Sequence, residues 1–525
     1  MVEPKVAPDL STGVPMAPVD RARRRGHILA IVAVLSILAS LLLMFWISAV
    51  SPNLRQFALP GVHGGPPWWP HNSRPRYASF VFNNWLAVIL GAIGVLAGLA
   101  AIRRGFRPRI GPLLGITVGV VALFTVLPPA GSTDSLNYAA YGRLAVLGVN
   151  PYVVTVRQFD KTSNDVVVHA AVNWATAVSV YGPLATGEQW LAAELGGDNV
   201  GHIVFWLKLW NALAFLSVAL ALDRLLRADP VRRARAHLIW SMNPLLLWAI
   251  VASGHVDGMA AAFGFFGLLV LRSADHNAIP AGRAFAAGLL TGIGTDFKAS
   301  VALFILGAAW VLRSSLRGFL ALAGGAALVL IPSFAPFGWT AVDAVLNRGG
   351  TVTWDNFYKL FYQPFGYYGR HLPGVSVVAG LLFVIVAIIA LRYLPDGYPS
   401  LPAVRPAMAL TLAFLFVWPF QRPWYDAIAL CLLALYAASV LDWLVLLQFG
   451  VGLLALMPSI SLAGISREPW PFRTFLQHWG GIPPAARLAA LLAFVGLCWW
   501  IRRRQRRGGG ELARTPRRLS PWPSH

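Results

Sequence analysis

Charged residues are scarce in this sequence: they make up 12% of its 525 residues, about half of the quarter that soluble globular proteins carry. Hydrophobic residues account for 57%, and the mean hydropathy is +0.62. This balance excludes a water-soluble enzyme and a disordered protein. The two cysteines, Cys431 and Cys498, both lie in apolar runs, which excludes a secreted disulfide scaffold. The composition therefore predicts a polytopic integral membrane protein.

Nucleotide-binding motifs are also missing. The sequence has neither a G-x-x-x-x-G-K-[ST] loop nor a Rossmann glycine pattern after a strand. An enzyme that works on the outer face of the membrane would have no access to nucleotide sugars. Such an enzyme needs an activated donor that arrives in the lipid. The net charge of +22 is attributed to cytoplasmic loops rich in Lys and Arg, and we expect no nucleic-acid partner.

The chain divides into three parts. Residues 1–27 are predicted to form a disordered cytoplasmic tail, residues 28–501 a single all-α membrane domain, and residues 502–525 a basic cytoplasmic tail. The first apolar run, Ile28 to Val50, follows four arginines but is too long for the core of a signal peptide. We therefore interpret it as a retained transmembrane helix.

Fourteen hydrophobic spans are expected between residues 28 and 501. The number falls to twelve if one of two doubtful pairs forms a re-entrant hairpin, either 284–296 with 299–312 or 406–420 with 424–439. The even number puts both termini on the same side.

Basic residues then fix the orientation. With the N-terminus inside, 28 of the 43 Lys and Arg residues fall on the cytoplasmic side, as the positive-inside rule requires. The long loops are predicted to lie outside and to carry interfacial helices, with 129–202 and 336–373 as the catalytic ones; the others are 51–79 and 459–485. We thus expect a multi-pass plasma-membrane protein whose active site is on the outer face.

The first candidate site follows the third span. If the segment from Thr133 is helical, Asp134, Tyr138 and Tyr141 share one face, with spacings of i, i+4 and i+7. A carboxylate there can accept a proton from a sugar hydroxyl, and aromatic rings beside it can hold the sugar. Alternatively, Ser132 or Asp134 caps an interfacial helix.

Two further clusters lie at span edges. His255 and Asp257 end the fifth span, where ionisable groups are costly unless they are paired or functional; as a metal signal, this His-x-Asp pair is weak. Lys298 lies between apolar runs, where it either pairs with Asp296 or meets an anionic head group such as a phosphate.

The last cluster surrounds Arg422, whose guanidinium suits a phosphate and whose neighbours Trp424 and Tyr425 can stack on a sugar or lie along a prenyl chain. The alternative is an aromatic belt with one snorkelling Arg. Tyr181, in a Tyr-Gly-Pro turn before an amphipathic helix, is by itself better explained by that turn. Under one topology, all of these clusters fall on the same face.

The ordered set of motifs resembles the polyprenol-phosphate-mannose-dependent α-1,6-mannopyranosyltransferases of actinobacteria, which belong to the multispanning GT-C class. The resemblance covers residues from about 80 to 440. It rests on Asp134-x3-Tyr138-x3-Gly142, Asn150-Pro151-Tyr152, Tyr181-Gly182-Pro183, Asn243-Pro244-Leu245, His255-Val256-Asp257, Lys298 and Pro423-Trp424-Tyr425. Two positions depart from the family pattern: Val256 replaces a polar residue, and Asp296 adds a charge near Lys298.

The resemblance implies a GT-C-like bundle of 12–14 spans and an inverting transfer of mannose from polyprenyl-phosphate mannose to a mannan or lipoglycan acceptor. Asp134 would be the general base, and Arg422 and Lys298 would stabilise the leaving phosphate. The substrate-binding residues would be Tyr138, Tyr141, Tyr181, His255, Asp257, Lys298, Arg422, Trp424 and Tyr425. No cofactor or metal is required, and the expected partners are the lipid-linked donor, the glycan acceptor and membrane lipids.

Two alternatives stay open at the level of sequence. Another polyprenyl-phosphate sugar, arabinose or glucose, is compatible with the same residues. A transporter or lipid flippase would line its pathway with intramembrane charges, but no internal repeat is visible, and the polar clusters lie on one face and not at the midplane.

Overall fold

The computed structural model describes residues 18–50, 76–171, 174–273, 279–346, 351–367, 371–459 and 481–512. In these ranges the regular structure is helical, with one isolated β-bridge between Thr351 and His371. The predicted all-α membrane fold is confirmed. Residues 1–17 and 513–525 of the predicted tails, and most of loops 51–79 and 459–485, lie outside the described residues. The first helix begins at Pro18, within the segment that was expected to be disordered.

Within the described ranges, six helices are long and apolar enough to cross a bilayer. They are α1 (Pro18–Val50), α2 (Tyr77–Arg103), α8 (Val200–Leu225), α14 (Leu316–Phe334), α17 (Val375–Tyr393) and α23 (Ile482–Leu512). The number is lower than the 12–14 spans expected because several apolar helices are too short to span alone. The shorter apolar stretches are Ile110–Val126 (α3), Ala299–Leu312 with α13 (Ala302–Leu312), Val404–Val417 (α18), Pro423–Leu433 with α19 (Ala427–Leu433), and Val440–Leu456 within α20 (Val440–Ser459).

One further pair of helical segments is long and apolar enough to cross a bilayer only when both halves are taken together, and we refer to this pair as the broken span. Its first half, Pro230–Ala252, contains α9 (Pro230–Ile239), α10 (Pro244–Leu246) and η2 (Leu247–Ala252), and its second half is α11 (Asp257–Val270); the two halves are bent by 114°. The bend falls at 253–256 and contains His255. Irregular backbone at membrane depth is tolerated where protein surrounds it, and Ala249, Val256 and Ala260 around this bend are all buried.

Small residues allow the helices next to the bend to approach closely. In the crossing of α12 (Ala281–Phe297) with α14, a Cβ added at Gly288 would overlap the carbonyl oxygen of Leu322, and one at Gly325 would overlap that of Phe285. Glycine at both positions therefore lets the two backbones touch, as is common between membrane helices.

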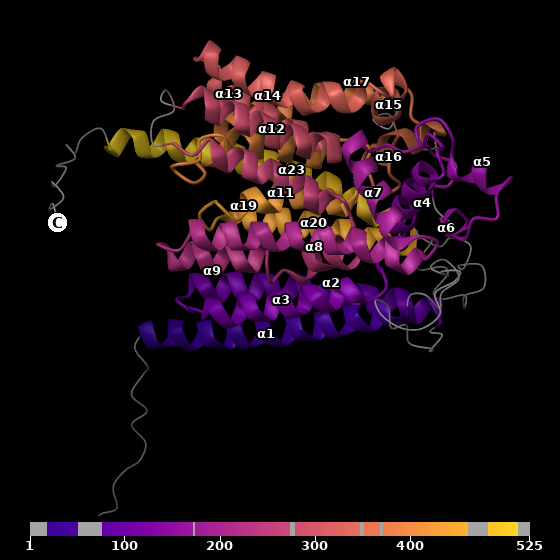
Figure 1. Cartoon of the computed structure of the whole chain (residues 1–525). Coiled ribbons are helices and arrows are strands. Elements are labelled where there is room, and N and C mark those ends of the chain that lie inside the picture. Colours follow the sequence, from indigo (N-terminus) through magenta and orange to yellow (C-terminus); the bar gives the residue numbers. More distant parts are fainter. Residues whose placement is uncertain are drawn as a thin grey trace, which may run out of the picture.

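The short helices of the two predicted catalytic loops gather at one end of the bundle. These are α4 (Asp134–Val146), α5 (Val156–Asp160), α6 (Val166–His169), α7 (Pro183–Gly196), α15 (Gly338–Leu346) and α16 (Tyr358–Tyr362). The start of α1 and the end of α23 lie at the opposite end (Figure 1). The short helices and these two helix ends are thus separated by the length of the bundle.

Candidate active site

A cavity of about 350 Å³ opens where the short helices meet the bundle. Its polar wall comes from α4, from the junction between α12 and α13, and from the loop between α18 and α19. Its apolar wall comes from α13, α15, α17 and α18, which contribute Leu303, Val345, Leu346, Phe383 and Phe414. One side of the cavity is therefore lined by charged groups and the other side by apolar side chains.

Asp134 is the first residue of α4 and lines this cavity. Ser132 Oγ accepts a hydrogen bond from the Asp134 backbone N–H at 3.2 Å, but the N-cap position of α4 is Thr133, so neither Ser132 nor Asp134 is the capping residue. The Asp134 carboxylate points elsewhere: its Oδ2 lies 3.6 Å from His255 Nε2, and its side chain is 15% exposed. The carboxylate is thus available to a molecule in the cavity.

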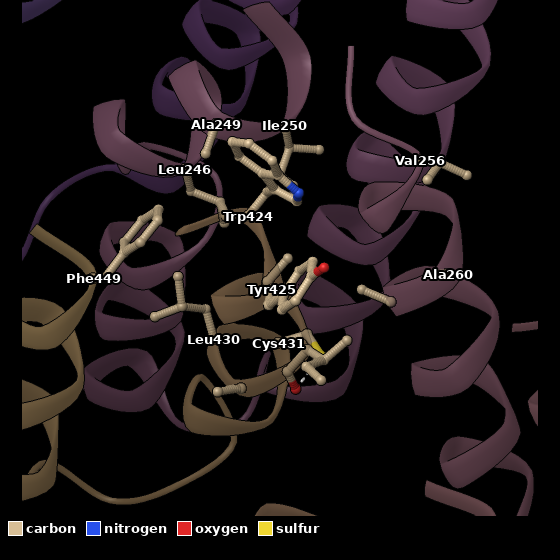
Figure 2. Packing of buried hydrophobic residues seen from close by; sticks show 14 of the residues in the cluster. Leu246, Ala249, Ile250, Val256, Ala260, Trp424, Tyr425, Leu430, Cys431 and Phe449 are labelled. Atoms are coloured by element: carbon tan, nitrogen blue, oxygen red, sulfur yellow. Dashed lines mark hydrogen bonds between the residues drawn. The ribbon is translucent and has the colours of Figure 1, made fainter. Parts of the chain in front are cut away.

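His255 lies behind Asp134 and is fully buried. Its Nδ1 is 2.5 Å from the carbonyl oxygen of Ala249. Because a carbonyl can only accept, Nδ1 carries a hydrogen and Nε2 is the atom that faces Asp134. The ring stacks on Trp424, with centroids 3.7 Å apart and planes 17° apart. In Figure 2, Trp424 lies beside Leu246, Ala249 and Ile250 of the broken span.

The surroundings of Asp134 keep its carboxyl group ionised. Burial raises its pKa, but the neighbouring His255 side chain and the charges of Arg422 and Lys298 outweigh burial and hold the pKa below its usual value. In contrast, burial raises the pKa of Tyr138 and of Tyr181. Their hydroxyl groups stay protonated, and Tyr181 donates to Tyr138 at 3.2 Å.

Lys298 lies in extended backbone between α12 and the short helix η4 (Ala299–Val301). Its Nζ is 3.5 Å from Asp257 Oδ2 and lies over the rings of Tyr181 and Tyr425, at 5.1 and 4.5 Å from their centroids. The expected alternative, a pair with Asp296, is wrong: the Asp296 carboxylate accepts from the backbone N–H of Leu184 at 2.7 Å and from Ser333 at 2.7 Å.

Arg422 has aromatic neighbours but no acidic one. Its guanidinium lies over Trp174 and Phe420, at 5.5 and 5.4 Å from the ring centroids. Within the described ranges, no carboxylate lies within ion-pair distance of Arg422, whereas both Lys298 and Arg487 have such a partner. A cation without a protein counter-ion, on the wall of a cavity, suits an anionic ligand.

The loop that carries Arg422 is anchored on both sides. Asn356 Nδ2 donates to the carbonyl of Trp418 at 2.9 Å, and Arg487 Nη1 donates to Gln421 Oε1 at 2.7 Å. Arg487 is itself paired with Asp355, with Nε 2.8 Å from Oδ2. The position of Arg422 thus depends on α23 and on the predicted outer loop 336–373.

The predicted site residues come together from distant parts of the chain. Two of them, His255 and Asp257, contact the lining side chains instead of the cavity. The other eight line the cavity: Asp134, Tyr138, Tyr141, Tyr181, Lys298, Arg422, Trp424 and Tyr425. The Tyr-Gly-Pro segment does begin a helix, α7, as expected, yet its Tyr181 also belongs to the site.

Asn137 and Trp174 were missed. Asn137 is 3% exposed and lines the cavity, and neither its amide nitrogen nor its amide oxygen has a hydrogen-bond partner. Its position three residues after Asp134 was a usable signal, since i and i+3 are neighbours on a helix. No such signal exists for Trp174, which reaches the cavity from an irregular segment. In the part of the chain that the structure describes, no three His, Cys, Asp or Glu side chains form a group able to hold a metal ion.

The membrane-crossing helices and the cavity with its ionised carboxylate define the class, an integral membrane enzyme. The sequence model described as "Alpha-(1->6)-mannopyranosyltransferase, N-terminal domain" matches residues 66–314. Over these residues, just under half of its length, the chain is similar to a family of mannosyltransferases, which are hexosyltransferases, as the motifs predicted.

Individual relatives agree with that assignment. Alpha-(1->6)-mannopyranosyltransferase B of Corynebacterium glutamicum is 23% identical over 440 residues, which cover 77% of this chain and 68% of the relative. A probable alpha-(1->6)-mannopyranosyltransferase of Mycolicibacterium smegmatis is 25% identical over 230 residues, 43% of this chain and 38% of the relative. No solved structure matches the chain.

Proposed function

We propose that this protein transfers a mannosyl residue from polyprenyl-phosphate mannose to a mannan- or lipoglycan-type acceptor, with inversion and formation of an α-1,6 linkage, on the outer face of the plasma membrane. The observation that carries the proposal is one cavity that joins an ionised carboxylate, an arginine without a protein counter-ion and an apolar wall. These three features match the hydroxyl, the phosphate and the prenyl chain of the two substrates.

Asp134 is the general base in this proposal. Its carboxylate takes the proton from the acceptor hydroxyl as that oxygen attacks the anomeric carbon of the donor. The carbon–oxygen bond to phosphate breaks, and polyprenyl phosphate leaves with the electron pair. His255, behind the carboxylate and fixed by Ala249, holds Asp134 in its ionised form.

Arg422 stabilises the charge that develops on the leaving phosphate. Its guanidinium N–H groups can donate to two phosphate oxygens. Because its neighbours are aromatic rings and not carboxylates, these N–H groups are available to a ligand. Lys298 adds positive charge across the cavity but is shared with Asp257. The unpartnered amide of Asn137 can donate to one sugar hydroxyl and accept from another.

The apolar wall accommodates the first isoprene units of the donor. Phe383, in this wall, belongs to α17, whose Val377, Leu381 and Ile388 are 68%, 62% and 57% exposed. Side chains this apolar and this exposed face the lipid in a membrane-spanning helix. A prenyl chain can therefore pass from the cavity along α17 into the bilayer.

The test is turnover by purified protein supplied with polyprenyl-phosphate mannose and a short α-mannoside acceptor. Asp134→Asn removes the proton acceptor while keeping the shape of the side chain, so turnover should fall by about 10²–10⁴-fold with donor binding retained. Glu194→Gln is the matched control, because Glu194 is an exposed acid on α7 outside the cavity.

Normal turnover by a folded Asp134→Asn protein would remove the general-base role. Turnover of polyprenyl-phosphate arabinose or glucose, but not of the mannose donor, would correct the sugar. Movement of the lipid across the bilayer without glycoside formation would indicate a flippase instead.

A further inference from the structure

A second cavity, of about 420 Å³, adjoins the first on the side of the short helices. Trp174 and Val180 line both cavities, so the two spaces share a wall. The second cavity is lined by segments of both predicted catalytic loops. Its lining consists of Tyr152, Thr155, Trp174, Thr176, Ala177, Val178, Val180, Thr340, Asp343, Ala344, Thr351 and His371.

The chemistry of the second cavity differs from that of the first. Its lining contains four threonines, a carboxylate and an imidazole, with Tyr152 and Trp174 as its aromatic side chains. The Tyr152 hydroxyl already bonds to Tyr181 O and to Thr186, at 2.8 and 2.9 Å, so Tyr152 offers only its ring. This surface suits a ligand with many hydroxyl groups and apolar C–H faces, and it does not suit a prenyl chain.

Trp174, in the wall shared by the two cavities, has an unusual backbone conformation. Its φ of +59° makes it the single non-glycine residue with a positive φ in the described part of the chain. Large side chains rarely adopt this conformation, and such strain persists where the surroundings fix it, often at ligand sites. The Trp174 ring lies beside Arg422 of the first cavity and also lines the second, so a ligand in either cavity meets the same indole.

We propose that the second cavity is an acceptor subsite, which binds a sugar residue that precedes the acceptor's reacting sugar while that reacting sugar lies in the first cavity beside Asp134. Asp343 and the threonine hydroxyls bind hydroxyl groups of the preceding sugar, and Trp174 packs against its ring. A volume of about 420 Å³ lies within the usual range for small-ligand sites. This inference rests on the proposed transferase function and adds that the enzyme recognises an oligosaccharide.

The experiment measures kcat/KM with alkyl glycosides of one, two and three α-1,6-linked mannose units. For the unaltered protein, kcat/KM should rise about tenfold or more from one unit to two, as expected when one or two hydrogen bonds to a charged group are added. Asp343→Asn should remove most of this rise and leave kcat/KM for the single-unit acceptor unchanged. Thr340→Val, which removes an exposed hydroxyl at similar volume, should remove part of it.

Asp198→Asn is the matched control, since Asp198 is an exposed acid just after α7 and lines neither cavity. A kcat/KM independent of acceptor length in the unaltered protein would overturn the subsite. So would an equal loss for all three acceptors in Asp343→Asn and Thr340→Val.

A binding measurement tests the subsite independently of the transfer reaction. Saturation-transfer NMR with free α-1,6-mannotriose reports binding without turnover. If no acceptor is turned over, the proposed function fails; mannotriose binding that Asp343→Asn abolishes would then still support the subsite, and absence of binding would overturn it.

Discussion

Two side chains have different roles at this site: Asp134 faces the cavity where a substrate would bind, and His255 influences the pKa of Asp134. Asp134 lines the cavity, whereas His255 is fully buried behind it and held by the Ala249 carbonyl and the Trp424 ring. A histidine in this position acts through the carboxylate. Its removal should therefore change the pH dependence of turnover more than the recognition of substrates.

His255→Phe keeps a ring to stack on Trp424 but removes both ring nitrogens. The pKa of Asp134 should rise, because burial still raises it while the largest opposing influence is gone. A general base works in its ionised form, so turnover is retained above the pKa and lost as pH falls through it. The acid limb of the kcat/KM profile should move to higher pH. An acid limb unchanged from that of the unaltered protein would show that His255 does not tune Asp134.

Sequence reasoning found these residues because polar side chains are conspicuous at the edges of apolar spans. Of the two alternatives left open for Lys298, the pair with the nearest acid, Asp296, was wrong. Asp296 lies in the last turn of α12 and turns toward α7, while Lys298 lies in the extended backbone after that helix and turns toward Asp257. Sequence reasoning also missed Trp174, because nothing in the sequence relates that residue to Arg422.

At the scale of elements, the start of α7 is fixed by a contact that the sequence does not reveal. Gly182 precedes Pro183, and its backbone N–H donates to the carbonyl of Asp296 at 2.9 Å. The Asp296 carboxylate accepts from Leu184 in the first turn of the same helix. The end of α12, next to Lys298, is thereby joined to the helix that follows Tyr181.

Gly182→Ala should loosen this junction. A Cβ at Gly182 would overlap the carbonyl and carboxylate oxygens of Asp296, so α7 has to move. We expect a loss of about 1–3 kcal/mol in stability, seen as a lower Tm, with reduced turnover because Tyr181 and Lys298 shift. Gly187→Ala is the control: it lies in the same helix with no neighbouring atom within 4 Å of its Cβ, and it should leave Tm equal or higher. An equal Tm for the two variants would contradict the role of Gly182.

The broken span was predicted in part. From the sequence, His255 and Asp257 were placed at the end of the fifth span. The 114° bend between the halves was not predicted, because hydropathy gives the length of an apolar run and not its direction. The bend lets His255 and Asp257 contact Asp134 and Lys298.

At the scale of the whole molecule, hydropathy predicted more spans than the six helices that are long and apolar enough to cross a bilayer among the described residues. A helix of 10–17 residues rises only about 15–26 Å, and five apolar helices of the described chain fall in that range. A window of sequence cannot tell a short helix surrounded by other helices from one that faces lipid. In the stretch Pro423–Leu433, for example, all seven residues of α19 are buried. The separation of the bundle into two chemically different ends was nevertheless predictable, because charge and polar motifs follow the two faces of the membrane.

The orientation of this bundle in the membrane can be tested with two single cysteines. Ser163 lies between α5 and α6, at the end of the bundle that carries the candidate site, and Ser314 lies between α13 and α14. Because α13 leads away from Lys298, Ser314 belongs to the opposite end, where the cytoplasmic loops are predicted to hold most of the basic residues. The native thiols, Cys431 and Cys498, are both buried, so their background labelling should be low. In intact cells, a membrane-impermeant maleimide should label Ser163→Cys and leave Ser314→Cys unlabelled until the membrane is permeabilised. The reverse pattern would place Asp134 and both cavities on the cytoplasmic side, where the proposed outer-face transfer to a cell-surface glycan could not occur.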